Sequence, residues 1–203
     1  MMNKVVFLNG PAGSGKDTIG RFLSDKISKS NIYKFADPLK KAVAAFFELS
    51  PDEYQYYFET QEGKNTPSPR FNNKSPREWL IGFSEDYAKK YGGKHIFGTI
   101  MARKLHSNFN SGIIDTAIIT DSGFTEEAEA VLNSFGNTVE FYLVRIHRNG
   151  FNFTGDSRGY IYLEKNHRLV NGFDITNEEG HVEDGVKRIT NRIEWDTTSV
   201  ELY

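Results

Sequence analysis

The chain has 203 residues, a formal net charge of −2 at pH 7 and no cysteine. The lack of cysteine excludes disulfide bonds, zinc–thiolate sites and cysteine nucleophiles, and the near-neutral charge does not favour general nucleic-acid binding. No apolar run reaches the length of a membrane span, and MMNK leads into a predicted strand rather than a signal peptide, so we expect a cytoplasmic protein without nucleic-acid or membrane partners.

Apolar runs alternate with segments of helical periodicity along most of the chain. This alternation predicts an α/β fold with a parallel five-stranded sheet covered by helices on both faces, in one domain spanning residues 1–203. The expected strands are residues 4–9, 31–35, 116–120, 138–146 and 172–176, and the expected helices are residues 15–29, 38–48, 76–91, 95–107, 124–134 and 181–194.

The first predicted strand, VVFLN, runs into the glycine-rich stretch GPAGSGKDT, and a helix is predicted directly after it. Such a strand, loop and helix direct backbone N–H groups and the positive end of a helix at one point, which suits a chain of phosphates. The spacing G-x-x-x-x-G-K indicates that Lys16 would contact the β- and γ-phosphates from a solvent-facing loop. The alternative is a glycine-rich turn with a surface lysine.

Two polar regions interrupt the regular alternation of strands and helices. Residues 50–74 are rich in proline, asparagine and tyrosine, and residues 147–160 are glycine-rich and basic. Long irregular segments are often lids or binding loops, although either region could be a plain surface insertion. The aromatic residues of the first region could stack on a nucleotide base or form an aromatic core; they are Tyr54, Tyr56, Tyr57, Phe58 and Phe71.

Carboxylates follow two of the predicted strands. Asp37 follows the second strand and Asp121 follows the strand TAIIT, so both fall, with the glycine-rich loop, at the sheet edge where open α/β folds bind ligands. Asp121 could bind Mg²⁺ through water, or it could be an ordinary turn or cap residue. The histidines show no metal-ligand spacing, and we assign them no chemistry.

Six stretches occur in one order along most of the chain: GPAGSGKDT, KFADPLKKAV, SPREWLIGFSEDYAKKYG, ITDSGFTEEAEAV, VRIHRNG and FDITNEEGHVEDGVKRI. Together they resemble the P-loop nucleoside monophosphate kinases, and more closely the phage-type deoxynucleoside monophosphate kinases. The resemblance implies a three-layer P-loop NTPase fold with an acceptor-binding helical insertion at about residues 50–110 and a lid at about residues 147–160. It also implies small-molecule nucleotides as partners, with ATP as phosphoryl donor and Mg²⁺ as cofactor.

On the donor side, the resemblance implies that Lys16, Arg148 and Arg158 act on the transferring phosphate. We expect the lid arginines to lack anionic partners until phosphates bind, whereas Arg145, in a strand, could be a structural ion-pair former. Phosphate repels a carboxylate, so Asp17 should point away or act through Mg²⁺ and water. Asp121 is the other carboxylate that the resemblance places at Mg²⁺. The residues expected to hold ATP are Gly10, Ala12, Gly13, Ser14, Gly15, Lys16, Asp17 and Thr18.

On the acceptor side, the resemblance implies that Arg77 binds the monophosphate, because a guanidinium group matches phosphate with two hydrogen bonds. Arg70 is a second candidate, and both arginines could instead be solvated surface charges. Asp37 could bind a base or sugar or cap the helix that begins at Pro38. The other residues implied on this side are Lys40 and Glu85.

The chain departs from the family pattern at two places. Gly123 stands where the family commonly has an arginine, and Ser-Glu-Asp stands where it often has Gly-Thr-Glu. Three interpretations therefore stay open: a nucleotide kinase, a P-loop kinase for another acceptor of the dephospho-coenzyme A or phosphomevalonate type, and a non-catalytic nucleotide-binding module. A GTPase is disfavoured because no Asn-Lys-x-Asp motif occurs. A homodimer is neither indicated nor excluded.

Overall fold

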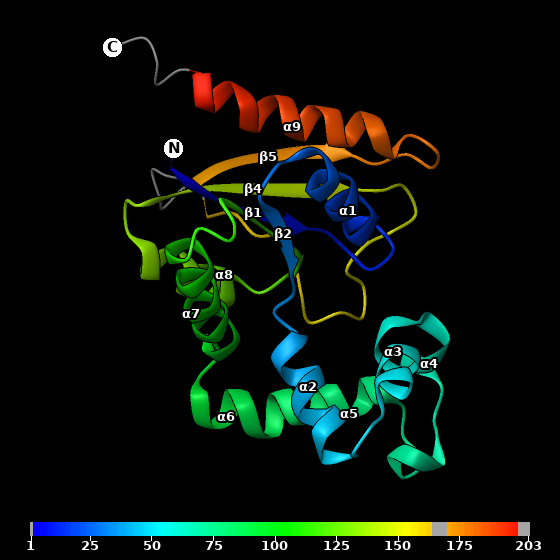
Figure 1. Cartoon of the computed structure of the whole chain (residues 1–203). Coiled ribbons are helices and arrows are strands. Elements are labelled where there is room, and N and C mark those ends of the chain that lie inside the picture. The colour runs from blue at the N-terminus through cyan, green and yellow to red at the C-terminus, as the bar shows by residue number, and fades with distance from the viewer. Residues whose placement is uncertain (1, 164–169, 199–203) are drawn as a thin grey trace. The chain divides into compact units, whose positions relative to one another are not determined.

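The computed structural model describes residues 2–163 and 170–198. The chain divides into two compact units, the first made of Met1–Phe35 and Gly98–Tyr203 and the second of Ala36–Phe97. Figure 1 labels the elements of both units. The acceptor-binding insertion expected at about residues 50–110 overlaps the second unit. In the part of the chain that is described, no helix is long and apolar enough to cross a membrane.

The first unit is built on a five-stranded parallel sheet with the strand order β2-β3-β1-β4-β5. This confirms the predicted fold class. The strands are β1 (Asn3–Asn9), β2 (Ser30–Tyr33), β3 (Thr116–Ser122), β4 (Val139–His147) and β5 (Val170–Thr176). The helices are α1 (Lys16–Lys26), α7 (Ile96–Asn110, which begins in the second unit), α8 (Thr125–Phe135) and α9 (Val182–Thr198).

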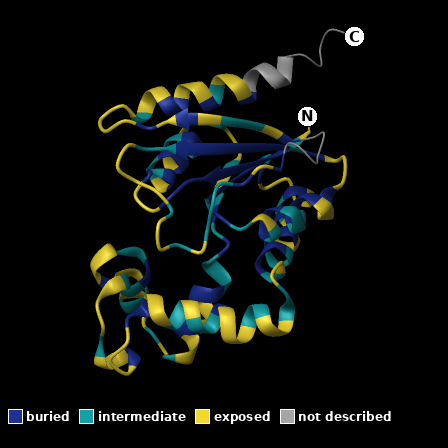
Figure 2. Ribbon diagram, turned by 180° about the vertical axis from the view of Figure 1, so that it is seen from behind, coloured by how far each residue is buried: buried dark blue, intermediate teal, exposed yellow. Residues whose placement is uncertain are grey.

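Helices cover both faces of this sheet because the central strands are apolar on both sides. On one face, Val6 and Leu8 of β1 pack with Ile19 of α1 and Ile189 of α9. On the other face, the ring of Phe141 in β4 contacts the ring of Phe7 in β1 and the ring of Phe135 in α8. Figure 2 shows these central strands as buried between exposed outer helix surfaces. The core therefore fixes the carboxyl ends of the strands, where the candidate site lies.

The second unit is helical, and it corrects the expectation that residues 50–74 are irregular. Its elements are α2 (Asp37–Phe46), α3 (Pro51–Glu59), α4 (Gln61–Asn65), a 3₁₀ turn (Pro69–Phe71), α5 (Pro76–Gly82), a π-helical stretch (Phe83–Ala88) and α6 (Lys89–Gly92). Ser50 and Ser75 each form a capping box with a glutamate three residues later, and a proline follows each serine. These reciprocal bonds start α3 where the composition suggests a loop, and they start α5 where a helix is predicted.

The aromatic residues of residues 50–74 mostly form the core of the second unit. Phe58 and Phe71 are fully buried in a cluster with Val43 of α2, and Tyr54 and Tyr57 pack against it. The rings meet edge to face, as for Tyr57 and Phe71 at 4.9 Å between centroids. Phe58 and Phe71 therefore cannot stack on a nucleotide base, and the aromatic-core alternative is correct for them. Tyr56 remains 42% exposed.

Candidate phosphate-binding site

The glycine-rich loop connects β1 to α1 at the carboxyl edge of the sheet. Gly13 and Gly15 adopt left-handed backbone angles, with φ of 80° and 94°. A Cβ atom at Gly13 would lie 2.3 Å from the ring of Phe151, and one at Gly15 would lie 2.3 Å from the Asn177 side-chain nitrogen. Glycine is thus required at both positions by conformation and by the packing of two distant segments on the loop.

Lys16 is the first residue of α1, and its side chain is folded into the loop. Its Nζ donates hydrogen bonds of 2.7 Å to the carbonyl oxygens of Gly10 and Pro11, and the residue is only 9% exposed. Burial, followed by the nearby charge of Arg158, lowers the pKa of Lys16 to about 8. The loop itself therefore encloses the ammonium group, and the alternative of a glycine-rich turn with a surface lysine does not fit.

Asp17 is directed toward the sheet rather than into the loop. Its Oδ1 accepts a 2.8 Å hydrogen bond from Thr120 of β3 and lies 3.2 Å from the Lys34 ammonium group. Burial raises the pKa of Asp17, but Lys34 and the Thr120 hydrogen bond outweigh it, so that the pKa is lower than usual. The carboxylate is thus ionised and held by partners of its own.

Asp121 lies at the end of β3, where its Oδ1 accepts a 2.8 Å hydrogen bond from the backbone N–H of Phe35. This bond joins the segment after β2 to the end of β3. The negative charge of Asp121 also acts to raise the pKa of Lys16 and of Arg158. For Lys16 this effect is outweighed by burial and by the charge of Arg158. Among the described residues, no cluster of three His, Asp or Glu side chains could hold a metal ion alone. Mg²⁺ bound together with a nucleotide needs only one or two carboxylates besides the phosphates, and Asp121 fits that requirement.

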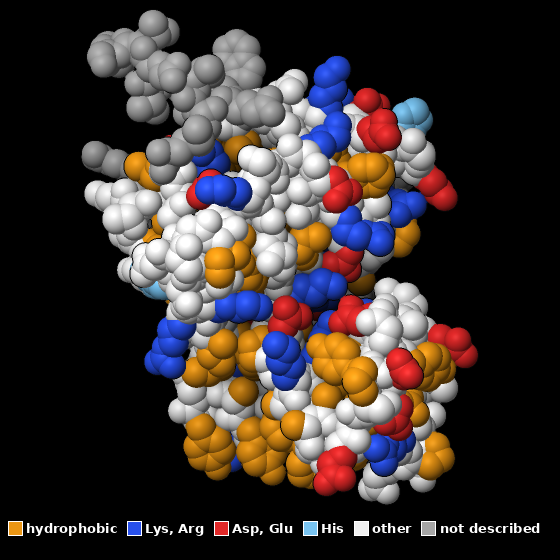
Figure 3. Space-filling model, in the orientation of Figure 1, with side chains coloured by type: hydrophobic (Ala, Val, Ile, Leu, Met, Phe, Trp, Pro, Cys, Tyr) orange, Lys and Arg blue, Asp and Glu red, His pale blue; other side chains and the backbone are white. Residues whose placement is uncertain are grey.

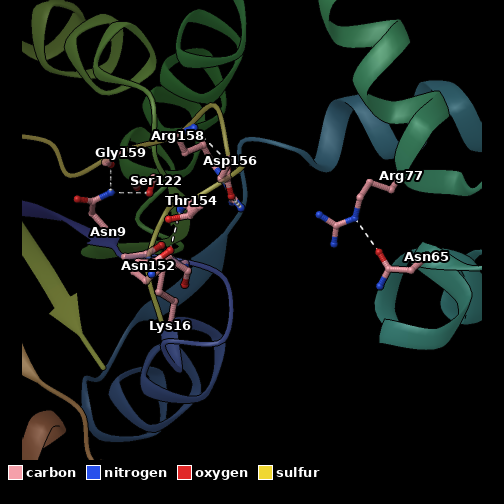
Figure 4. A network of polar contacts seen from close by, with 12 residues as sticks. Asn9, Lys16, Asn65, Arg77, Ser122, Asn152, Thr154, Asp156, Arg158 and Gly159 are labelled. Carbon is pink, nitrogen blue, oxygen red and sulfur yellow. Dashed lines mark hydrogen bonds and ion pairs between the residues drawn. The ribbon is translucent and has the colours of Figure 1, made fainter. Parts of the chain in front are cut away.

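Residues 148–163 contain no helix or strand, as expected for the lid region. Its two selected arginines nevertheless have acidic partners, contrary to our expectation. Arg148 donates a 3.0 Å hydrogen bond to the Gly13 carbonyl oxygen and lies 3.4 Å from a Glu179 carboxylate oxygen. Arg158 is bound to Asp156, and both side chains are 24% exposed. Figure 4 shows the contact between Arg158 and Asp156. Arg148 thus lies on the glycine-rich loop, and the charge of Arg158 acts on Lys16.

Two asparagines that sequence analysis passed over hold this site together. The Asn9 amide donates to the carbonyl oxygens of Ser122 and Gly159, at 3.0 and 2.9 Å, and its oxygen accepts from the Ile161 N–H. The Asn177 amide donates a 2.7 Å hydrogen bond to the Ser14 carbonyl oxygen. A polar residue at the end of an otherwise apolar strand, as in VVFLN, is the signal that could have identified Asn9.

Arg145 of β4 forms a structural ion pair, as one of the two interpretations proposed. Its Nε and Nη2 donate to the two carboxylate oxygens of Asp174 on β5, at 3.1 and 3.0 Å. A third donor reaches the carbonyl oxygen of Ile161. Arg145 is 4% exposed, so this pair links β4 to β5 and to the end of the lid segment.

The acceptor-side candidates lie in the second unit. Arg77, in the first turn of α5, donates from Nε to the side-chain oxygen of Asn65 at 2.8 Å (Figure 4). Arg70 is bound to the corner between α2 and α3, through Glu53 at 3.4 Å and the Glu48 carbonyl oxygen at 3.1 Å. Of the two arginines, Arg77 keeps both Nη groups out of the hydrogen bond to Asn65, so it is better suited to bind a phosphate.

The remaining acceptor-side candidates are engaged within the second unit. Lys40 is 6% exposed, and its Nζ lies 2.6 Å from Glu59. Glu85 lies in the π-helical stretch and pairs with Lys89 at 2.8 Å. Asp37 is the first residue of α2 rather than its N-cap, which is Ala36. Burial, then the charges of Asp37 and Glu59, raise the pKa of Tyr54 to about 12.

No protein-family model and no curated protein matches the chain. Among similar solved structures is the protein TT1252 from Thermus thermophilus, with 13% identity, coverage of 97% of this chain and 98% of that chain, and a TM-score of 0.51. The APS kinase of Mycobacterium tuberculosis has 11% identity, coverage of 95% and 98%, and a TM-score of 0.46. The thymidylate kinase of Candida albicans has 10% identity, coverage of 97% and 93%, and a TM-score of 0.44. At these identities the likeness shows the fold alone, which is an α/β fold.

Proposed function

We propose that this chain is a P-loop kinase that transfers the γ-phosphoryl group of ATP to a nucleoside or deoxynucleoside monophosphate. The observation that carries the proposal is the grouping of three cations around one loop. Lys16 is enclosed by the loop, Arg148 contacts it at Gly13, and the charge of Arg158 acts on Lys16. Phosphoryl transfer needs little besides alignment and positive charge around the moving phosphate, and these residues supply both.

The phosphates of ATP would replace the carbonyl oxygens of Gly10 and Pro11 as partners of Lys16. The hydroxyl of Ser14 is fully buried and has no hydrogen-bond partner among the described residues, which fits a loop that receives a further polar group. Asp121 is the carboxylate we assign to Mg²⁺, and the ion would neutralise the charge that develops between the phosphates. Asp17 supports the loop through Thr120 and Lys34.

The acceptor monophosphate would be bound by the second unit, with Arg77 as the phosphate ligand. The resemblance of the DPLK and SPRE stretches to phage-type enzymes favours a deoxynucleotide. Ring stacking by Phe58 and Phe71 does not support tolerance of several bases, because both rings are in the core. Asp37 and Glu85 remain the candidates for recognising the base, because a polar group that the wrong base leaves unpaired discriminates strongly.

The test is to incubate the protein with Mg²⁺, ATP labelled on the γ-phosphate and each nucleoside or deoxynucleoside monophosphate in turn. We expect the label to appear in the diphosphate of at least one deoxynucleotide, and Lys16→Ala is the matched inactive control. Label transferred only to dephospho-coenzyme A or phosphomevalonate would establish the second interpretation instead.

A non-catalytic nucleotide-binding module is the less favoured interpretation. Its main support in the sequence is Gly123, which stands where the family commonly has an arginine, so that an expected cation is missing. In the structure the Arg158 side chain lies directly on Gly123. A cation is therefore present at this turn, although it comes from a different segment of the chain.

A further inference from the structure

Arg158 has a defined place in the first unit, on the backbone of Gly123. A Cβ atom at Gly123 would lie 2.6, 2.7 and 2.8 Å from the Cδ, Cγ and Cβ atoms of Arg158. Gly123 is not among the glycines with positive φ, so its backbone does not itself require glycine. The missing side chain at this position is required by the arginine that covers it.

The backbone on either side of this contact is held by hydrogen bonds. The Gly159 N–H donates to the Gly123 carbonyl oxygen at 3.1 Å. Asn9 then bridges the two segments, because its amide donates to both Ser122 and Gly159. The residues that flank Arg158 and Gly123 are therefore joined to each other and to the end of β1, as the dashed contacts in Figure 4 show.

Asp156 fixes the orientation of the Arg158 side chain. Its Oδ1 accepts from Nε at 2.9 Å, and its Oδ2 accepts from Nη2 at 2.5 Å. The same Oδ1 accepts from the Arg158 backbone N–H at 3.0 Å, which ties the carboxylate to the chain as well. Asp156 thus accepts hydrogen bonds from Nε and Nη2 of the guanidinium group, while Nη1 donates to no described residue. Nη1 is therefore the donor that a bound anion could use.

We propose that Gly123 and Asp156 are positioning residues for Arg158: Gly123 leaves the space in which the side chain lies, and Asp156 orients its Nη1 donor toward the transferring phosphate. This inference rests on the proposed function. A donor that is already aligned stabilises developing charge without having to reorganise during the reaction. The side chain of Arg158 is in that case already oriented before the substrates bind.

The kinetic test is a pair of double-mutant cycles. We expect Asp156→Ala to lower kcat about 10- to 100-fold while the KM for ATP changes little, since misaligned catalytic groups cost that much. Asp156→Asn, which keeps one acceptor oxygen, should lose less. In an Arg158→Ala background Asp156→Ala should cost almost nothing more, and Gly123→Ala should likewise lose its effect in an Arg158→Gly background. Equal losses with and without Arg158 would overturn the proposal.

A spectroscopic readout separates this inference from the proposed function. The Arg158 Nε–H signal in a ¹H–¹⁵N spectrum, assigned by its loss in Arg158→Lys, should be sharp and shifted by the bond to Asp156. It should return to the position of solvent-exposed arginines in Asp156→Ala and Gly123→Ala. An unshifted signal in the unaltered protein would overturn the positioning role. A shifted signal in a protein that phosphorylates no monophosphate would contradict only the proposed function.

Discussion

At the scale of single residues, the chemistry of the site centres on the buried lysine of the glycine-rich loop. The motif predicted Lys16 as a phosphate ligand, but it did not predict that the loop encloses its ammonium group. The pKa of about 8 follows from this burial and from the charge of Arg158. The position of Arg158 is set by tertiary contacts beyond the motif.

The substitution Lys16→Ala should abolish phosphoryl transfer, because it removes the positive charge on the donor phosphates. Steady-state turnover with ATP measures the effect, and circular dichroism confirms that the fold is retained. Lys16→Met, which keeps most of the buried stem, is the matched control for packing and should be equally inactive. Unchanged turnover in both variants would exclude Lys16 from the phosphate site.

The pH dependence of kcat/KM for ATP should show an alkaline limb near pH 8. Lys16 must be protonated to bind phosphate, so activity is present below the pKa of about 8 and lost as the pH rises through it. Arg158 lowers this pKa, whereas Asp17, Asp121 and Asp156 raise it. Arg158→Gln should therefore move the limb to higher pH. A limb that stays in place would show that Lys16 does not control it.

At the scale of elements, the sequence predicted the strands and the main helices well but did not predict α3. All five strands and the order of the main helices follow from apolar periodicity, because burial against the sheet determines both. Helix α3 was missed because prolines and asparagines concealed the capping box that begins at Ser50. The aromatic residues of the second unit were ambiguous, since a ring suits a core as well as a ligand.

The ion pair between β4 and β5 should contribute measurably to stability. Asp174→Ala leaves the buried Arg145 guanidinium group without its two-bond partner, and we expect a loss of about 2 kcal/mol in the free energy of unfolding. Asp184→Ala is the control, because its pair with His181 is exposed and should contribute less than about 0.5 kcal/mol. Urea unfolding of both variants decides, and equal stabilities would contradict a structural role for Arg145.

At the scale of the whole molecule, we propose that the first unit binds the donor ATP and that the second unit binds the acceptor. Sequence motifs assigned residues to both sides, but contacts within the second unit engage most of the acceptor-side candidates. Some hydrophobic side chains also lie at the surface of that unit (Figure 3), among them Phe46, Ile81, Tyr87 and Tyr91. The contacts that engage the acceptor-side candidates depend on packing partners far away in the chain, so a motif alone could not predict them.

Arg77→Ala should weaken binding of the acceptor far more than binding of ATP. Losing a two-bond contact to phosphate costs about 2–3 kcal/mol, which raises the acceptor KM about 30-fold or more. Arg70→Ala is the matched control, because its guanidinium group is already bound to Glu53 and the Glu48 carbonyl oxygen. Steady-state kinetics with each substrate varied in turn measures both variants. Equal effects of Arg77→Ala on the two substrates would move it out of the acceptor site.

The proposed activity is transfer of a phosphoryl group from ATP to an acceptor at the glycine-rich loop, with three cations around the moving phosphate. The most direct measurement is the amount of nucleoside diphosphate formed from the monophosphate for each ATP consumed, together with the inorganic phosphate released. We expect a ratio near one with an accepted deoxynucleoside monophosphate and stable ATP in its absence, because closure of the proposed lid would exclude water. ATP consumption that releases inorganic phosphate without any acceptor product, or no ATP consumption with any acceptor, would contradict it.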